Sequence, residues 1–319
     1  MLNAQQAAAK EAAHRQFDCP SRVAAEERGY IEGRDKLPRF RHGVAGIGIA
    51  GDVLRIYVLE DLAADVEAPA EFEGLRTERV LTTGFHDLVA PRQTRLSPTP
   101  CGVSIGNAKP TGRGPVTAST GTLGCLIDTP GGRCVLSNNH VLALSNAANL
   151  GDHVFQPSLS DGSGSNPPTR IATLTDFEPL RFGSAVNRID AAIAALDEID
   201  SAIPDIMTIG PPASPPVAPF LGQSVVKHGR TTGLTFGSVV DTSFDGNVHY
   251  DGAVAYFEDQ IVIVGDAGPF SERGDSGSLV LDTSGPHPVG LLFAGDNSQT
   301  IANPIQFILN RFGATVAAT

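Results

Sequence analysis

Short apolar runs, separated by glycine, proline and small polar residues, fill the chain from residue 116 onward. This punctuation is typical of antiparallel β-sandwiches and barrels, in which strands alternate with tight turns. A proline-rich stretch at 201–220 breaks the series near its middle, so we expect it to connect two β-barrels. The expected strands are GTLGCLID, CVLSNN, RIDAAIAAL, QSVVKHG, GLTFGSVVD, DQIVIVG, SGSLVLD and PVGLLFAG.

The chain before this series has a mixed pattern. Residues 7–15 are rich in alanine with interspersed lysine and glutamate, which favours a helix. Two apolar β-runs within 43–60 are broken at Gly51-Asp52, which predicts a hairpin, and a third run near 79–83 could join them. Prolines recur through 88–115, so this segment is expected to be a linker or a strap over the next domain.

These patterns predict a mainly β protein, with a double β-barrel preceded by a small N-terminal α+β region. The glycines, serines and prolines of 161–168 predict an exposed loop, and 303–311 reads as a closing helix with Pro304 in its first turn. The expected divisions are 1–36 for a helical segment, 37–100 for a small α+β accessory domain and linker, and 101–319 for the main domain, with barrel one at about 116–200 and barrel two at about 221–310.

Composition narrows the range of partners. The 319 residues carry a net charge of −12, which repels nucleic-acid phosphates and anionic lipid, so neither nucleic acid nor a membrane is expected as a partner. No uncharged apolar run is long enough to span a bilayer, and the opening residues lack the pattern of a secretory signal. A cytoplasmic location is therefore expected.

The four cysteines match no metal-binding spacing. Cys19, Cys101, Cys125 and Cys134 are too sparse to hold a chain of this length together, and we expect free buried thiols. Cys125 and Cys134 flank a predicted hairpin turn at 129–132. A cross-strand disulfide in an oxidising compartment is the alternative.

The pentapeptide Gly274-Asp275-Ser276-Gly277-Ser278 leads from a loop into an apolar strand. Its glycines allow a tight turn that exposes the Ser276 hydroxyl and brings backbone N–H groups together beside it. Acyl transfer needs this combination of a nucleophile and hydrogen-bond donors. An ordinary Ser-Gly hairpin turn is the alternative interpretation.

A serine hydroxyl is a weak nucleophile at neutral pH and needs a histidine base oriented by a carboxylate. His140 follows a strand that ends in Ser137-Asn138-Asn139, a polar run expected to leave the ring facing a cleft. Asp190 is the one acid in the apolar run IDAAIA, where a buried carboxylate would be costly without a partner. We predict that Asp190 orients His140, and an exposed aspartate at a strand edge is the alternative.

The remaining histidines and aspartates are weaker candidates. His228, in KHGR, is the main competitor of His140. The other histidines are expected on the surface: His14, His42, His86, His153, His249 and His287. The alternative orienting acids, in more loop-like settings, are Asp152, Asp176 and Asp197.

The candidates follow the order His140, Asp190, Ser276, which chymotrypsin-type double barrels use and subtilisin-type and α/β-hydrolase chains do not. With the motifs SNNHV, DAAI and GDSGS around them, residues 116–310 resemble the chymotrypsin-fold, trypsin-like serine peptidases, in a bacterial-type form with short loops. The resemblance implies a chymotrypsin-like double β-barrel with the active site in the cleft between the barrels.

The resemblance also implies a serine endopeptidase that acts on protein or peptide substrates without a metal or organic cofactor. Ser276 would attack the peptide carbonyl while His140 takes its proton, and Asp190 would hold the imidazole tautomer. The backbone N–H groups of Gly274 and Ser276 would bind the oxyanion.

Departures from the trypsin pattern indicate a different specificity. Phe270 stands six residues before Ser276, where trypsins keep an acidic residue. The expected pocket is small or apolar and consists of Phe270, Ser271, Phe293, Ala294 and Gly295. No activation-cleavage site is evident ahead of Val116, so Asp275 is expected to pair with a backbone N–H or an arginine. The run GRTTGLTFG at 229–237 matches a subgroup of bacterial and plant trypsin-like proteins, and no role is assigned to it.

Two other functions are alternatives. A catalytically silent binding or scaffold protein could keep the peptidase fold, although it would not need to keep all three catalytic side chains. An esterase could use the same nucleophile, although lipases have a different chain order and a Gly-x-Ser-x-Gly turn.

Overall fold

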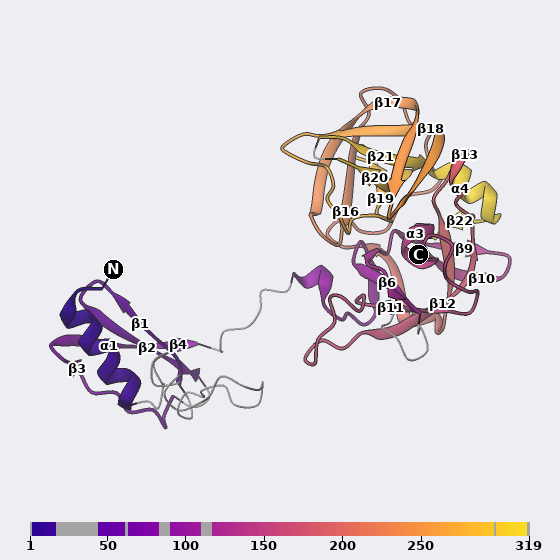
Figure 1. The fold of residues 1–319 in the computed structure, drawn as a ribbon. Helices are drawn as coiled ribbons and strands as arrows, with labels where there is room; N and C mark the ends of the chain where they lie inside the picture. The colour runs from indigo at the N-terminus through magenta and orange to yellow at the C-terminus, as the bar shows by residue number, and fades with distance from the viewer. Residues whose placement is uncertain are drawn as a thin grey trace. The chain divides into compact units, whose positions relative to one another are not determined.

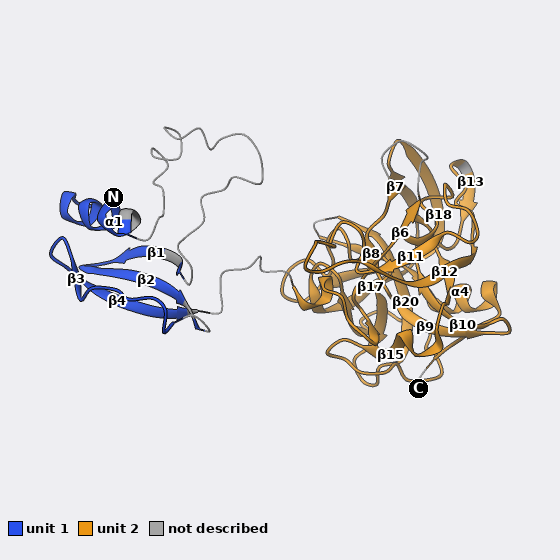
Figure 2. Ribbon diagram, turned by 90° about the horizontal axis from the view of Figure 1, so that it is seen from below, with its two compact units in different colours: residues 1–88 blue, residues 89–319 orange. Residues whose placement is uncertain are grey.

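The computed structural model describes residues 2–16, 44–60, 63–82, 90–109, 117–296 and 298–317. The chain divides into two compact units, residues 1–88 and residues 89–319, which Figure 2 distinguishes by colour. Each unit has its own hydrophobic core, and the two are described separately.

The first unit is a small sheet with one helix on it. Helix α1 (Ala4–Gln16) packs on strands β1 (Val44–Ala50), β2 (Val53–Leu59), β3 (Glu71–Phe72) and β4 (Leu75–Thr82), which lie in the order β1-β2-β4-β3. Strands β1 and β2 form the predicted hairpin, with Gly51 at a φ of 59° in its turn. Strand β4 runs parallel to β2. The small side chains Ala9 and Ala13 are fully buried in this core, so the helix can approach Leu54 and Ile56 closely.

The second unit begins with the first barrel. Its strands are β6 (Ser104–Lys109), β8 (Gly121–Thr122), β9 (Cys125–Thr129), β10 (Gly132–Ser137), β11 (His153–Gln156), β12 (Thr169–Phe177) and β14 (Ala192–Leu196), with β7 (Thr117–Ala118) and β22 (Thr315–Val316) at the ends of the sheet. The sheet closes because one continuous segment pairs on both sides: β8 pairs with β6, and β9 pairs with β10. The barrel therefore starts at β6, earlier in the chain than the expected residue 116.

The second barrel follows and closes more regularly. Its strands are β16 (Ser224–Gly229), β17 (Gly233–Tyr250), β18 (Ala253–Gly265), β19 (Leu279–Asp282), β20 (Pro288–Gly295) and β21 (Thr300–Pro304), drawn in orange to yellow in Figure 1. The sheet runs β18-β17-β16-β19-β20-β21, and the pairing of β18 with β21 closes it. The prediction of a mainly β chain with two barrels is confirmed.

Strands β17 and β18 extend beyond the barrel as a long hairpin, and β13 (Gly183–Asn187) pairs with β18 in parallel. The sequence analysis identified only the barrel portions of these two strands. The outer half of β17 alternates between exposed and half-buried residues, so no continuous apolar run marks it. Tyr250 lies at the outer end of this hairpin.

Short elements complete the second unit. Helix α3 (Asn139–Leu142) follows β10, and η3 (Pro91–Gln93) lies in the predicted strap. The connection after barrel one carries η4 (Ile199–Ser201) and β15 (Ala202–Ile206), and β15 pairs with β5 (Thr99–Cys101). Helix α4 (Ile305–Phe312) confirms the predicted closing helix. No described helix is long and apolar enough to cross a bilayer.

The prediction of free, buried thiols can be checked at three of the four cysteines. Cys101, Cys125 and Cys134 are free and buried, and Cys19 lies outside the described residues. Cys125 faces Leu136 across the β9–β10 pair, whereas Cys134 faces Ile127, so the two thiols are out of register for a bridge. Burial raises the pKa of the Cys125 thiol to about 12, which keeps it protonated and unreactive.

Candidate active site

His140 and Asp190 form the predicted pair. His140 lies in the first turn of α3, where the chain leaves β10, and its ring Nδ1 donates to Asp190 Oδ2 at 2.6 Å. The backbone N–H of His140 donates to Asp190 Oδ1 at 3.2 Å, so one carboxylate holds both the ring and its backbone. The carboxylate is fully buried, whereas the histidine side chain keeps 22% of its surface exposed. Part of the histidine side chain is thus open to solvent.

Buried amides fix the backbone around this pair. Asn303 Oδ1 accepts the N–H of Asp190 at 2.9 Å, and Asn138 Nδ2 donates to the Asp190 carbonyl at 2.7 Å. Asn139 Nδ2 donates to the carbonyl of Glu178 at 2.7 Å. The polar residues before His140 are therefore buried anchors of the turn. They hold the histidine in place through the backbone, while the sequence had indicated only that they open a cleft.

Ser276 comes from the second barrel and is brought against the first one. Thr122 N donates to Ser276 O at 2.8 Å, which joins β8 to the serine turn. Gly121 makes this approach possible, because a Cβ there would lie 2.8 Å from Ser276 O and 2.5 Å from a methyl group of Val141. Gly121 is thus a close neighbour of both Val141, the residue after His140, and the carbonyl of Ser276.

Ser276 is half-buried, and within the described chain its hydroxyl has no hydrogen-bond partner, the His140 ring included. Catalytic hydrogen bonds are often long in an unliganded protein and tighten when substrate binds. Gly277 has a φ of 95°, and a Cβ there would meet Ser137 Oγ at 2.1 Å. The turn after Ser276 therefore requires glycine at this position.

Two backbone N–H groups of the serine turn are unused. Asp275 N donates to Glu272 O, Gly277 N donates to Leu292 O, and Ser278 N donates to Asp275 O. Among the described residues, Gly274 N and Ser276 N have no such acceptor. These are the two groups predicted to bind an oxyanion, and neither is taken up by another group of the described protein.

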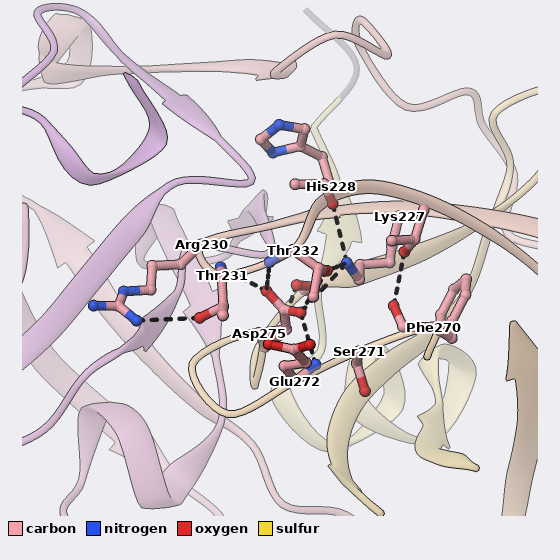
Figure 3. Close-up of polar contacts among 12 residues, drawn as sticks. Lys227, His228, Arg230, Thr231, Thr232, Phe270, Ser271, Glu272 and Asp275 are labelled. Atoms are coloured by element: carbon pink, nitrogen blue, oxygen red, sulfur yellow. Dashed lines mark hydrogen bonds and ion pairs between the residues drawn. The ribbon is translucent and has the colours of Figure 1, made fainter. Parts of the chain in front are cut away.

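Asp275 is held by a cage of donors, which Figure 3 shows in close-up. Its Oδ1 accepts Thr231 N at 2.7 Å and Thr232 N at 3.1 Å. Its Oδ2 accepts Thr232 Oγ1 at 2.7 Å and Glu272 N at 3.0 Å, and Lys227 Nζ lies 3.5 Å away. The predicted backbone partners are confirmed, and the cation is a lysine, not an arginine. This cage gives the GRTTG run its structural role.

Lys227 is a fully buried cation. Neither it nor Asp275 exposes any side-chain surface, and Nζ also donates to Thr232 Oγ1 and to Gly233 O. Burial lowers the pKa of Lys227, and the charge of Asp275 opposes that effect. The charges of Lys227 and Asp275 thus neutralise each other, and this pair leaves no unpaired charge behind the serine turn.

Arg230 points away from the cage and pairs with Asp161 of the first barrel. Asp161 also accepts Ser104 Oγ at 2.6 Å, and its side chain is only 6% exposed. Burial raises its pKa, but the bonds from Arg230 and Ser104 outweigh this and lower it overall. The prediction that 161–168 is an exposed loop is therefore wrong at its first residue, because that carboxylate links the two barrels.

The strap also contacts the loop that holds Asp275. Arg92 Nε donates to Arg230 O at 2.9 Å, and Arg92 Nη2 donates to Thr231 O at 2.6 Å. The same short loop thus gives its carbonyl groups to the strap, while its N–H groups bind Asp275. The predicted strap over the domain is confirmed for this segment.

The competing candidates lie elsewhere. His228 is buried and its Nδ1 lies 2.9 Å from Gly102 O, and burial lowers its pKa, so it is a neutral structural histidine. Asp176 pairs with Arg311, and Asp197 pairs with Arg170. Asp152 accepts Asn149 N in a turn, while His153 and His249 are exposed and His287 is half-buried on Pro215 O. His14, His42 and His86 lie outside the described side chains.

The expected pocket residues do not form one wall. Phe270 is 2% exposed and packs in the core of the second barrel with Val225 and Ile263. Phe293 packs in a different cluster against Phe257, with ring centroids 4.7 Å apart. The remaining members are Ser271, which is buried and hydrogen-bonded to Thr300, and Ala294 and Gly295, which reach the surface. Phe270 is thus a core residue because it packs among residues from the strands of the second barrel.

Tyr250 and Lys227 are the site residues that the sequence analysis missed. Tyr250 Oη donates to Asp190 Oδ2 at 2.8 Å from the end of a strand in the other barrel. No spacing signal links residues 60 positions apart on different sheets. A lysine in the middle of an apolar run was a possible signal for Lys227, since such a residue is costly to bury without an acid. The described residues contain no cluster of three or more metal-binding side chains.

The comparisons with known proteins add a partial family match. The model described as the Nal1 C-terminal domain matches residues 163–304. The protein NARROW LEAF 1 of Oryza sativa subsp. japonica is 26% identical over 138 residues, which are 42% of this chain and 22% of that protein. This chain therefore spans about a fifth of the length of that relative.

Solved structures resemble the second unit. A glutamic acid-specific serine protease, described as using a novel histidine triad in substrate binding, is 18% identical with a TM-score of 0.47, and the match covers 69% of this chain and 100% of that one. Thermobifida fusca protease A is 18% identical with a TM-score of 0.43, covering 67% and 97%. Cellulomonas bogoriensis chymotrypsin is 17% identical with a TM-score of 0.43, covering 67% and 97%. The chain resembles chymotrypsin-fold serine proteases, and the likeness is one of fold.

Proposed function

We propose that this protein is a serine endopeptidase that hydrolyses peptide bonds through an acyl-enzyme. One observation carries the proposal. The paired His140 and Asp190 stand on the first barrel, while the turn that presents Ser276 with two unused N–H groups is hydrogen-bonded to the same barrel.

The residues supply each step of acyl transfer. His140 Nε2 takes the Ser276 hydroxyl proton as the oxygen attacks the peptide carbonyl, and Asp190 keeps the opposite ring nitrogen protonated and stabilises the imidazolium. The N–H groups of Gly274 and Ser276 bind the oxyanion, and each such donor contributes about 3 kcal/mol. His140 then gives the proton to the leaving amine, and water releases the acyl group by the same route.

We further propose that the serine turn needs no proteolytic activation. In the trypsin-like peptidases that this sequence resembles, proteolytic activation creates a new N-terminal amine, which pairs with the acid before the catalytic serine. Here Lys227 and the donors of Thr231, Thr232 and Glu272 already hold Asp275. The full chain is therefore expected to be active without cleavage.

We propose that the protein recognises substrates with small or apolar side chains. Of the five expected pocket residues, Ala294 and Gly295 are the two that reach the surface, at the end of β20, so the proposed preference rests on these small residues. An apolar pocket discriminates side chains by only about 1 to 3 kcal/mol per methylene, so pairing of an extended substrate contributes to selectivity.

Residues 1–88 are proposed as an accessory unit that recruits substrate or regulates access. The cytoplasm is the proposed compartment, where free thiols such as Cys125 persist.

The proposal is tested by digesting a proteome-derived peptide library with the full chain. We expect new peptide termini with small or apolar residues on the acyl side, and Ser276→Ala or His140→Ala should lower turnover by roughly 10⁶. Ser163→Ala, in an exposed loop, is the matched control and should cleave like wild type. If wild type and Ser276→Ala yield the same peptides, the protein is not a peptidase, and the binding or scaffold alternative takes its place.

A further inference from the structure

Tyr250 touches the buried carboxylate from outside the predicted triad. It is the last residue of β17, at the outer end of the long hairpin, and its hydroxyl donates to Asp190 Oδ2 at 2.8 Å. The same oxygen accepts the His140 ring at 2.6 Å. One carboxylate oxygen is therefore shared between the imidazole of one barrel and a phenol of the other.

The phenol completes the hydrogen bonding of an acid that water does not reach. Asp190 is 0% exposed, and its carboxylate accepts the backbone N–H and the ring N–H of His140 and the hydroxyl of Tyr250. A buried anion needs such donors, and the loss of one costs more than an ordinary hydrogen bond. Burial, followed by the charge of Asp190, raises the pKa of Tyr250 well above its usual value, so the phenol stays protonated and donates.

Aromatic neighbours hold the phenol in this direction. The Tyr250 ring lies edge-on to His140, with centroids 5.9 Å apart, and edge-on to Phe182 at 5.8 Å. Phe257, across the hairpin, lies 6.5 Å from it. The ring thus has contacts on several sides, and its hydroxyl points at the carboxylate without a competing partner among the described residues.

We propose that Tyr250 is a positioning residue for the catalytic pair, which sets the direction of the Asp190 carboxylate and limits its attraction for the protonated imidazole. The inference rests on the proposed peptidase function. It also makes the hairpin of β17 and β18 a part of the active site, because the residue that orients the acid is carried at the hairpin's end.

Removal of the hydroxyl has two separate consequences. In Tyr250→Phe the ring contacts remain, but Asp190 loses a donor, so the carboxylate is less firmly oriented and acylation slows by about tenfold. The remaining negative charge then attracts the imidazolium more strongly. The acidic limb of the pH–rate profile is therefore expected to move to higher pH.

Few other titratable or charged groups lie close enough to Asp190 to shift the acidic limb of the pH–rate profile. The groups that face Asp190 are His140 from α3, Tyr250 from β17, and the neutral amides of Asn138 and Asn303. Arg188, two residues before the acid, is largely exposed and pairs with Asp259. Among the described residues that hydrogen-bond to this carboxylate, His140 and Tyr250 are the titratable ones.

The test measures the rate of Ser276 labelling by a fluorophosphonate from pH 5 to 9 on the full chain. Tyr256→Phe is the matched control, since this tyrosine lies on β18 of the same hairpin and faces Asn247 across it. We expect Tyr250→Phe to label about tenfold more slowly, with its acidic limb shifted upward, and Tyr256→Phe to match wild type. A merely structural role would lower the rate at every pH without moving the limb. Unchanged rate and unchanged limb would also overturn the inference.

A second readout does not depend on catalysis. The proton between His140 Nδ1 and Asp190 should give a low-field proton resonance, and its chemical shift should change in Tyr250→Phe and not in Tyr256→Phe. If wild type fails to label, the proposed function fails, and the resonance still decides whether Tyr250 acts on the pair. If wild type labels but Tyr250→Phe behaves identically in both measurements, only the role of Tyr250 is refuted.

Discussion

The ion pair behind the serine turn gives the sharpest prediction about stability. Lys227→Met keeps an unbranched apolar side chain but removes the ammonium group, which lies 3.5 Å from Asp275 and 5.8 Å from the centroid of the Phe270 ring. Both side chains are fully buried, and removal of one partner of a buried pair typically costs 3 to 5 kcal/mol because the other charge stays behind. Asp275 retains its bonds from Thr231, Thr232 and Glu272. We therefore expect the lower end, about 3 kcal/mol.

For a unit of this size, about 3 kcal/mol corresponds to a fall in melting temperature of roughly 6 to 12 °C. Calorimetry of the full chain measures this fall in the transition of the second unit. Lys109→Met is the control, because that lysine lies near the surface and its change should stay within about 0.5 kcal/mol. The double variant Lys227→Met with Asp275→Asn should recover part of the loss, since neither charge is left unpaired, although the amide NH2 replaces an oxygen that accepts from Glu272 N. A Lys227→Met variant as stable as its control would refute the account of the cage.

Two further predictions concern the acids and the buried histidine. Asp190→Asn should lower the labelling rate by about 10⁴, because the imidazole is then held in the wrong tautomer. Asp176→Asn breaks a surface pair with Arg311 and should leave the rate unchanged. The reverse result would assign the orienting role to Asp176. Because the folded pKa of His228 lies below its unfolded value of about 6.5, stability is lost as pH falls from that value toward the folded pKa. His228→Asn keeps a donor for Gly102 O, so its melting temperature should fall less than that of wild type between pH 7 and 5, and equal slopes would contradict this assignment.

The sequence was most informative where one local pattern decides the structure. The hairpin at Gly51-Asp52, the barrel strands and helix α4 follow from short apolar runs and turn residues, and all are present. The pairing of His140 with Asp190 was also predictable, because a lone acid in an apolar run needs a partner.

The rest depends on contacts between distant segments. Strand β6 belongs to barrel one because the segment after residue 120 pairs back on it, and no local pattern indicates that closure. Phe270 was expected at a surface pocket, but packing against residues from the strands of the second barrel places it in the core. The bond from Tyr250 to Asp190 arises only when the long hairpin folds toward the other barrel, so residue spacing gives no hint of it.

Activation of Ser276 by His140 and Asp190, beside two unused N–H donors, is tested by tandem mass spectrometry of the full chain after reaction with a fluorophosphonate. We expect a single adduct on Ser276 that His140→Ala abolishes. An unmodified protein, or an adduct on another residue that forms equally well without His140, would contradict it.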